Sequence, residues 1–262
     1  MTGKDRFYNR AKQEGYRARS AYKLKQLDAT AELVGPGDTV VDLGAAPGGW
    51  LQVAAEAVGD HGKVVGVDRQ RVDDLDSHVV ETVCGDMTDE RTRDRLRDAV
   101  NAAGAEDYPV DAVVSDMAPN MTGEYELDHA RSVHLSRQAF ETALELLAPG
   151  GDFAVKVFEG RDLDDFRDDV ADEFEYVRTV SPRASREESS EVYVVGKGRI
   201  DAPVAAGERL TVEVTDVGDE GDGVAEVDGY TVFVPDADAG ETVAVTVAEV
   251  TPRFGFAERV DD

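Results

Sequence analysis

The 262 residues could form one large domain or two smaller ones, and a hydrophobic content of 41% excludes disorder of the whole chain. A single cysteine, Cys84, excludes an internal disulfide, and no apolar run is long enough for a secretory signal or a membrane span. A formal net charge of −28 argues at first against nucleic acid as a partner. From the cysteine count and the lack of a long apolar run we expect a soluble, cytoplasmic protein.

The charge is unevenly distributed along the chain. Residues 1–25 carry eight basic side chains and two acidic ones, so this segment is +6 and the remainder is −34. An acidic body that is poor in lysine is typical of adaptation to a salt-loaded cytoplasm, as in halophiles, where at about 1 M salt the screening length falls to roughly 3 Å. A basic cluster kept against that background predicts an anionic partner, although a merely solvated N-terminal arm remains the alternative.

Apolar runs alternate with amphipathic segments over the first two hundred residues. We predict a helix over 19–33, and helical spacing predicts further helices over 89–104 and 134–151. The predicted strands are 39–43, 63–68, 78–84, 110–116, 152–158, 175–180 and 191–196. This alternation predicts an α/β fold with a mostly parallel seven-stranded sheet covered on both faces, and its last two strands form an antiparallel pair at one edge.

The pattern changes after residue 200. β-branched and polar residues alternate there between closely spaced glycines, which predicts roughly five short strands and a small antiparallel β-barrel of the OB-like kind. The segment 196–207 is the predicted linker. We therefore expect one domain over residues 1–198, including the basic N-terminal arm, and a second over 203–262.

The stretch VVDLGAAPGGW, residues 40–50, is a strand that enters a glycine-rich turn and then a helix. Gly44, Gly48 and Gly49 would let the backbone approach a ligand closely. Their spacing differs from the G-x-G-x-x-G of dinucleotide-binding folds, which disfavours a nicotinamide dehydrogenase. A tight turn without a ligand remains possible.

Four consecutive predicted strands each carry an aspartate near the carboxyl end: Asp42, Asp68, Asp86 and Asp116. Ligands of open α/β sheets bind at this edge. Asp68 suits two ribose hydroxyls, Asp86 could accept from an adenine amino group, and Asp116 would lie beside the reacting end. Several carboxylates suit a cationic, phosphate-free nucleoside such as S-adenosylmethionine.

The stretch FAVKVF, residues 153–158, surrounds Lys156 with five apolar neighbours. An ammonium inside an apolar strand is costly unless it is paired or faces a polar cleft. The ordinary alternative is a lysine on the solvent face of an edge strand.

Four stretches occur in the order and spacing of one known pattern: DLGAAPGGW (42–50), SDMAPNMTG (115–123), FAVKVFEG (153–160) and SPRASREESSEVYVVG (181–196). Together they resemble the FtsJ/RrmJ family of S-adenosylmethionine-dependent ribosomal RNA 2′-O-methyltransferases, over about residues 4–198. The tail, GDGVAEVDGYTVFVPDADAGE, resembles a TRAM domain, a small β-barrel RNA-binding module. A methyltransferase followed by a TRAM domain resembles the archaeal branch of the family.

The resemblance implies a Rossmann-like methyltransferase fold and a set of site residues. It implies a catalytic tetrad, which falls on Lys23, Asp116, Lys156 and Glu191. It also implies cofactor contacts at Gly48, Trp50, Asp68, Asp86 and Asp116. In this interpretation Lys156 orients the ribose 2′-oxygen and either accepts its proton or stabilises the alkoxide, while Asp116 and Glu191 hold the ammonium and Lys23 positions the hydroxyl or a phosphate.

The predicted activity is methylation of a ribose 2′-hydroxyl, of a uridine, in 23S ribosomal RNA of the large subunit. The expected partner is RNA, with neither DNA nor a membrane involved, and we favour a monomer. No metal is expected, because the four histidines and Cys84 lack metal-ligand spacing. Transfer RNA as the substrate and a non-catalytic RNA-binding assembly factor remain alternatives, while DMAPN lacks the aromatic residue expected for methylation of a base amino group.

Overall fold

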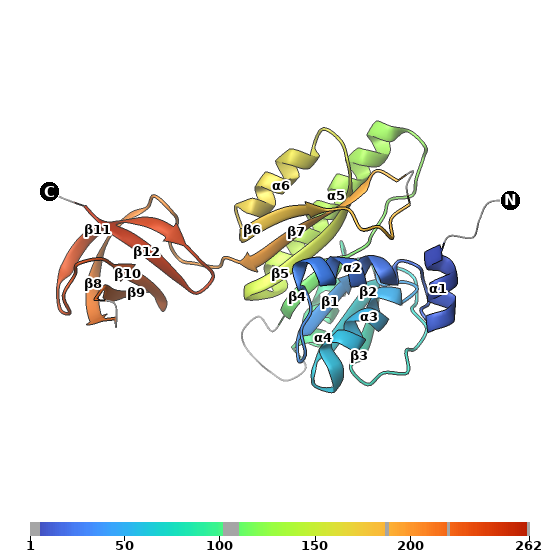
Figure 1. The fold of residues 1–262 in the computed structure, drawn as a ribbon, viewed down its shortest axis with the longest axis horizontal. Helices are drawn as coiled ribbons and strands as arrows, with labels where there is room; N and C mark the ends of the chain where they lie inside the picture. Colours follow the sequence, from blue (N-terminus) through green and yellow to red (C-terminus); the bar gives the residue numbers. More distant parts are fainter. Residues whose placement is uncertain (1–5, 102–109, 187–188, 219–220, 261–262) are drawn as a thin grey trace.

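The computed structural model describes residues 6–101, 110–186, 189–218 and 221–260. In this part of the chain a seven-stranded sheet flanked by helices is followed by a closed five-stranded barrel (Figure 1). The end of the helix predicted over 89–104 and the first residues of the basic arm, including Lys4, lie outside the described residues. The described part contains no helix that is long and apolar enough to cross a bilayer.

The sheet has the strand order β3-β2-β1-β4-β5-β7-β6. Its strands are β1 (Thr39–Leu43), β2 (Lys63–Asp68), β3 (Val80–Cys84), β4 (Val110–Ser115), β5 (Leu147–Phe158), β6 (Phe174–Val180) and β7 (Glu191–Arg199). The first five strands are parallel, whereas β7 is antiparallel to both β5 and β6. The predicted fold class, with its antiparallel pair at one edge, is confirmed.

Helices cover both faces of this sheet (Figure 1). They are α1 (Arg6–Glu14), α2 (Ala21–Ala31), α3 (Gly49–Val58), the short 3-10 helix η1 (Gly59–His61), α4 (Glu90–Val100), α5 (Tyr125–Leu146) and α6 (Leu163–Ala171). One apolar core joins the sheet to α1, α2 and α3, and a second core joins the opposite face to α4, α5 and α6. Each strand of the sheet interior is therefore buried on both sides, as its nearly continuous apolar run predicts.

Helices α1, α5 and α6 differ from the prediction. Helix α1 was not predicted, and α5 ends at Leu146 rather than at residue 151, because strand β5 begins at Leu147. Helix α5 begins at Tyr125, well before residue 134, because Asp128 in its first turn accepts hydrogen bonds from the backbone N–H groups of Thr122 and Gly123. Helix α6 was not predicted, since four of its nine residues are acidic and only Phe166 and Val170, four residues apart, are fully buried.

The C-terminal barrel has the strand order β10-β12-β11-β8-β9 and closes on itself. Its strands are β8 (Arg209–Val217), β9 (Gly223–Val227), β10 (Tyr230–Val234), β11 (Thr242–Val250) and β12 (Phe254–Arg259). The five-stranded barrel is confirmed, but it is not wholly antiparallel as predicted, because β10 and β12 pair in parallel. Its interior is filled largely by valine. Strand β7 extends to Arg199, into the predicted linker, because the buried Arg199 side chain donates to the carbonyl of Leu147.

Strand register brings the motifs to one level at the carboxyl edge of the parallel strands. Ser115, the last residue of β4, pairs with Leu43 of β1 and with Val155 of β5. The residues that follow each of these, namely Gly44, Asp116 and Lys156, therefore emerge side by side. This edge carries the candidate site.

Candidate active site

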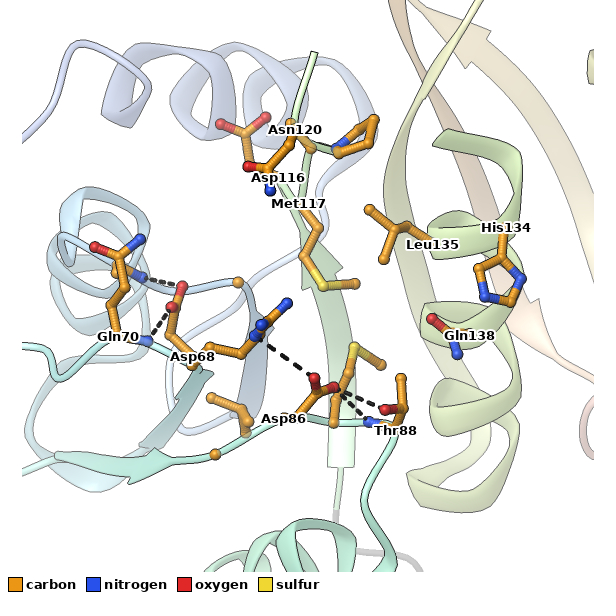
Figure 2. A pocket seen from close by; sticks show the side chains of 18 of the residues that line it. Asp68, Gln70, Asp86, Thr88, Asp116, Met117, Asn120, His134, Leu135 and Gln138 are labelled. Atoms are coloured by element: carbon orange, nitrogen blue, oxygen red, sulfur yellow. Dashed lines mark hydrogen bonds and ion pairs between the residues drawn. The ribbon is translucent and has the colours of Figure 1, made fainter. Parts of the chain in front are cut away.

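A cleft of about 930 Å³ opens at this edge (Figure 2). Its walls come from the ends of β1, β2, β3 and β4 and from one side of α5. The lining residues with polar side chains are Asp68, Arg69, Gln70, Asp86, Thr88, Asp116, Asn120, Arg131, His134 and Gln138. A cleft of this size holds a nucleoside-sized ligand.

The glycine-rich loop forms the floor of the cleft at Gly44. This residue has φ of +87°, and a Cβ there would lie 2.4 Å from Cγ of Met117. Both the left-handed backbone and the close contact require glycine, since any side chain would push the loop away from the segment after β4. The loop and that segment are thereby held together at the cleft.

Backbone N–H groups fix two of the cleft carboxylates. Asp68 accepts hydrogen bonds from the N–H of Ala46, at 2.9 Å, and of Gln70, at 2.7 Å. Asp86 accepts from the N–H and the hydroxyl of Thr88, which lower its pKa, and its Oδ2 lies 3.5 Å from Nε of Arg69 (Figure 2). Asp86 therefore stays ionised, and both carboxylates keep lone pairs for hydroxyl or amino donors of a ligand.

Beside the cleft, two lysines and two acids form a connected cluster. Nζ of Lys156 lies 2.8 Å from Oδ1 of Asp116, and Nζ of Lys23 lies 3.4 Å from the same oxygen. Nζ of Lys23 also lies 2.6 Å from Oε1 of Glu191. The hydroxyl of Tyr193 donates to Oδ1 of Asp116 at 2.6 Å. The four tetrad residues predicted from the sequence are therefore brought together in one chain of ion pairs.

Strand alternation explains how a lysine fits into the apolar run of β5. Val155 and Val157 belong to the core beneath α5, whereas Lys156 and Ala154 point to the opposite face. On β7, Tyr193 lies directly across from Lys156. The Lys156 side chain is only 7% exposed on a central strand, so the solvent-face alternative is wrong.

The charges of this cluster shift the pKa values of its acids. Burial alone would raise the pKa of Asp116, but the nearby ammonium groups of Lys156 and Lys23 outweigh it and hold the pKa below its ordinary value. Burial raises the pKa of the Tyr193 phenol well above its usual range, and the charge of Asp116 acts in the same direction. Asp116 is therefore an anion and Tyr193 a neutral donor at neutral pH.

A second hollow, of about 400 Å³, lies on the other side of the cluster. Its lining includes three arginines, Arg6, Arg183 and Arg186, several serines, and Glu191. Asp116 lines the larger cleft and Glu191 lines this hollow. The lysine cluster thus lies between a carboxylate-lined cleft and an arginine-lined hollow.

A family model described as FtsJ-like methyltransferase matches residues 16–199 of this chain, and a TRAM domain model matches residues 203–260. The chain belongs to the FtsJ-like methyltransferase family. It is 69% identical over 261 residues to the ribosomal RNA large subunit methyltransferase E of Halorubrum lacusprofundi, covering 100% of this chain and 95% of that protein. It is 44% identical to the protein of the same name from Methanosarcina mazei, over 97% of this chain and 92% of that protein.

A solved structure also resembles the FtsJ-like part of the chain. It is described as a ribosomal RNA methyltransferase from Plasmodium falciparum, with a TM-score of 0.61 and 25% identity. The match covers 70% of this chain and 98% of that one. The chain is thus similar to that structure in fold as well as in sequence.

Not every predicted cofactor residue of this FtsJ-like methyltransferase lines the cleft. Asp68, Asp86 and Asp116 do, but Gly48 and Trp50 are not part of its walls. Trp50 is buried, and its indole N–H donates to the carbonyl of Ser20 at 2.7 Å. Both residues therefore shape the loop between β1 and α3 in this structure.

Two further features depart from the sequence interpretation. Glu191 was expected to hold Lys156, but its ion pair in the structure is with Lys23. The cleft wall on α5 was missed, although Arg131, His134 and Gln138 recur at helical spacing and could have indicated a polar face.

Much of the basic N-terminal cluster has partners within the protein. Arg17 donates to the backbone carbonyls of Asp73 and Asp74, and Arg19 donates to that of Ala184. Lys25 pairs with Glu56 at 3.2 Å. These side chains fix loops around the site, so the described part of the basic segment, residues 6–25, is not simply a solvated arm.

Asp42 is the fourth aspartate of the predicted set, and it lies beneath the cleft rather than in its wall. Its side chain is buried, and neither carboxylate oxygen has a hydrogen-bond partner in the described ranges. Burial raises the pKa of Asp42 well above its usual range, and the charges of Asp116 and Asp68 act in the same direction. The folded state therefore favours the protonated form of Asp42.

This burial predicts a pH-dependent stability difference for Asp42→Asn. Unfolded Asp42 loses its proton above about pH 4 whereas the folded residue keeps it, so the wild type loses stability relative to the variant as pH rises. The slope of this difference reaches at most about 1.4 kcal/mol per pH unit. Denaturant unfolding of both proteins between acidic and alkaline pH measures it, with the exposed Asp76→Asn as control. A pH-independent difference would contradict a raised pKa.

Proposed function

We propose that this FtsJ-like methyltransferase transfers the methyl group of S-adenosylmethionine to the 2′-hydroxyl of a uridine in 23S ribosomal RNA. The name of its relatives, ribosomal RNA large subunit methyltransferase E, supports the substrate class. The observation that carries the proposal is the lysine cluster between the two hollows. A methyl donor in the cleft and a ribose at the basic hollow would meet at Lys156.

The donor set of the cleft fits S-adenosylmethionine. Asp68 and Asp86 offer acceptors for ribose hydroxyls and an adenine amino group, and Met87 and Leu135 line the cleft with apolar surface. Asp116 adds a negative charge close to the reacting end, where the cofactor is cationic. When bound, S-adenosylmethionine supplies a methyl group activated by a sulfonium. The proposal assigns no step to a metal ion.

Lys156 is proposed to act as the base. The ribose oxygen is a poor nucleophile while it keeps its proton. The Lys156 ammonium would first release a proton to solvent, and the resulting amine would accept the hydroxyl proton as the oxygen takes the methyl group and the carbon–sulfur bond of the donor breaks. Asp116, 2.8 Å from Nζ, then stabilises the ammonium that results. Lys23, held between Asp116 and Glu191, orients the ribose from the other side. Alignment of the two substrates supplies much of the rate.

The arginine-lined hollow is proposed to hold the RNA backbone next to the target nucleotide. Arg183 and Arg186 are exposed and carry guanidinium groups that suit phosphate oxygens. Glu191 joins this hollow to Lys23. A nucleotide whose phosphate lies here would place its ribose at the cluster.

Replacing these arginines should reduce the salt dependence of RNA binding. For each of Arg183→Ala and Arg186→Ala we expect weaker binding and a slope of log affinity against log salt that falls by about one. Fluorescence anisotropy with a labelled ribosomal RNA fragment over a salt series measures both quantities. Arg91→Ala is the matched control, because Arg91 is exposed on helix α4. An unchanged slope in both variants would remove the hollow from the RNA path.

The function itself is tested by methyl transfer from labelled S-adenosylmethionine. Free 23S ribosomal RNA, assembled large subunits and transfer RNA are offered in parallel, and the nucleosides of the labelled product are identified. A 2′-O-methyl uridine in 23S ribosomal RNA is the expected product. A methylated base, or label in transfer RNA alone, would overturn the assignment. Mapping of 2′-O-methylation in cells lacking the protein identifies the nucleotide.

A further inference from the structure

Three phenylalanines gather on the outer surface of the C-terminal barrel. Phe233 of β10 lies beside Phe254 and Phe256 of β12, with ring centroids 5.5 to 5.7 Å apart in all three pairs. Phe256 is 40% exposed, and Phe233 and Phe254 are partly exposed. We call these three residues the phenylalanine cluster.

The exposure of this cluster is unusual for the chain. The chain has nine phenylalanines, and the other six are all buried in the sheet domain: Phe7, Phe140, Phe153, Phe158, Phe166 and Phe174. The residues of β10 and β12 that alternate with the cluster, such as Val232 and Ala257, fill the barrel core. The barrel core is therefore complete without these rings. Adjoining exposed aromatic rings of this kind mark a binding surface.

The charge of the barrel limits what this surface binds. Residues 203–260 contain 13 acidic residues and three arginines. One of the arginines, Arg259, pairs with Glu241, and Glu249 of β11 lies directly across from Phe256. At low salt this excess of acidic residues repels phosphate groups. When salt screens the repulsion, the barrel still offers few cations, chiefly the exposed Arg209 and Arg253, to hold the backbone of an RNA. Bases carry no charge and have flat apolar faces, which suit aromatic side chains.

We propose that the phenylalanine cluster binds unpaired RNA bases by stacking, with little contribution from phosphate contacts. This inference rests on the proposed function for RNA as the partner, and it concerns a surface separate from the reaction site. In this proposal the FtsJ-like domain and the barrel make different contributions to RNA binding. The arginine-lined hollow supplies an electrostatic contribution that weakens as salt rises, whereas the barrel supplies a stacking contribution that persists.

The test measures binding of the full chain to a short oligouridylate and to an abasic ribose-phosphate chain of the same length, over a KCl series. For Phe256→Ala and Phe254→Ala we expect about tenfold weaker binding of the oligouridylate at every salt concentration, with an unchanged salt slope. Binding of the abasic chain should be the same in the wild type and in both variants. Equal losses for both ligands, or no loss for either, would overturn the proposal.

Matched variants separate stacking from folding. Phe256→Leu keeps an apolar side chain but loses the aromatic face, so it should bind as weakly as Phe256→Ala, whereas Phe256→Tyr should bind like the wild type. Thermal unfolding should be unchanged in all of them, since the side chain lies outside the barrel core. A large loss of stability with normal RNA affinity would show that the rings pack against another part of the protein, and would overturn the proposal.

Sedimentation distinguishes the remaining occupant, a second copy of the chain. A wild-type dimer that Phe256→Ala converts to a monomer would assign the surface to self-association and overturn base stacking. Methyl transfer measured on the same variants keeps the two proposals distinct. If the phenylalanine substitutions leave oligouridylate binding unaffected while the wild type methylates ribosomal RNA normally, the phenylalanine proposal fails alone. If no RNA is methylated by the wild type but stacking is observed, the proposed function fails alone.

Discussion

Lys156→Ala is expected to lower the rate of methyl transfer by about 10³-fold, equivalent to about 4 kcal/mol, while leaving the affinity for S-adenosylmethionine nearly unchanged. In the proposed mechanism Lys156 contributes an amine beside the reacting oxygen, and its side chain is not part of the cleft wall. The loss should therefore fall on kcat. Single-turnover transfer to ribosomal RNA measures the rate, and calorimetric titration measures cofactor binding.

Lys63→Ala is the matched control for this variant. Lys63 lies at the amino end of β2, on the opposite edge of the sheet, and pairs with Glu81. Its removal should change transfer little. Turnover of Lys156→Ala at the wild-type rate would remove this lysine from the chemistry, and would favour a binding protein whose tetrad has only a structural role.

The sequence was sufficient to predict the fold class because its signals are local and repeated. Short apolar strands alternate with amphipathic helices. After residue 200, β-branched and polar residues alternate between closely spaced glycines, which predicts a barrel. The tetrad was predicted in two ways: the sequence pattern itself drew attention to Lys156 and Asp116, whereas Lys23 and Glu191 came from the resemblance to the FtsJ/RrmJ family. Lys156 contradicts its apolar surroundings, and an uncompensated ammonium there would be too costly to retain. A charge in an apolar strand therefore predicts a partner, although not which acid provides it.

The features that were missed depend on contacts between distant segments. Tyr193 donates to Asp116, but only the antiparallel register of β5 and β7 places it across from Lys156. Tyr193 is two positions after Glu191 on the same strand, so period-two spacing indicated that they share a face without indicating what Tyr193 does. The family resemblance implied Trp50 as a cofactor contact, whereas in the structure its indole packs 5.9 Å from the Tyr193 ring.

The lysine cluster also explains why the pKa values of two buried aspartates near the site shift in opposite directions. Burial acts to raise the pKa of both Asp116 and Asp42. Two ammonium groups outweigh it at Asp116 and lower that pKa, whereas at Asp42 the charges of Asp116 and Asp68 add to the effect of burial and the pKa rises. Partners decide which of two buried aspartates carries the charge. From the sequence alone both were predicted in the same way, as aspartates near the carboxyl ends of strands.

Asp116→Asn is expected to impair both transfer and cofactor binding, unlike Lys156→Ala. Asp116 lines the cleft and its Oδ1 accepts from Lys156 and Tyr193. We expect kcat to fall by about 10³-fold and KM for S-adenosylmethionine to rise by about tenfold. Steady-state kinetics separates the two effects, with the exposed Asp76→Asn as control. An unchanged KM would place Asp116 outside the cofactor site.

The double variant Asp116→Asn with Lys156→Ala tests whether the two groups act as one unit. Because the base works only with its counter-ion, the double variant should be no slower than the slower single variant. Multiplying losses would mean that the two groups act independently. The lowered pKa of Asp116 gives a separate check, because its stabilising effect is present above the ordinary pKa and is lost as pH falls through the lowered value. The stability difference between the wild type and Asp116→Asn should therefore shrink only below about pH 4.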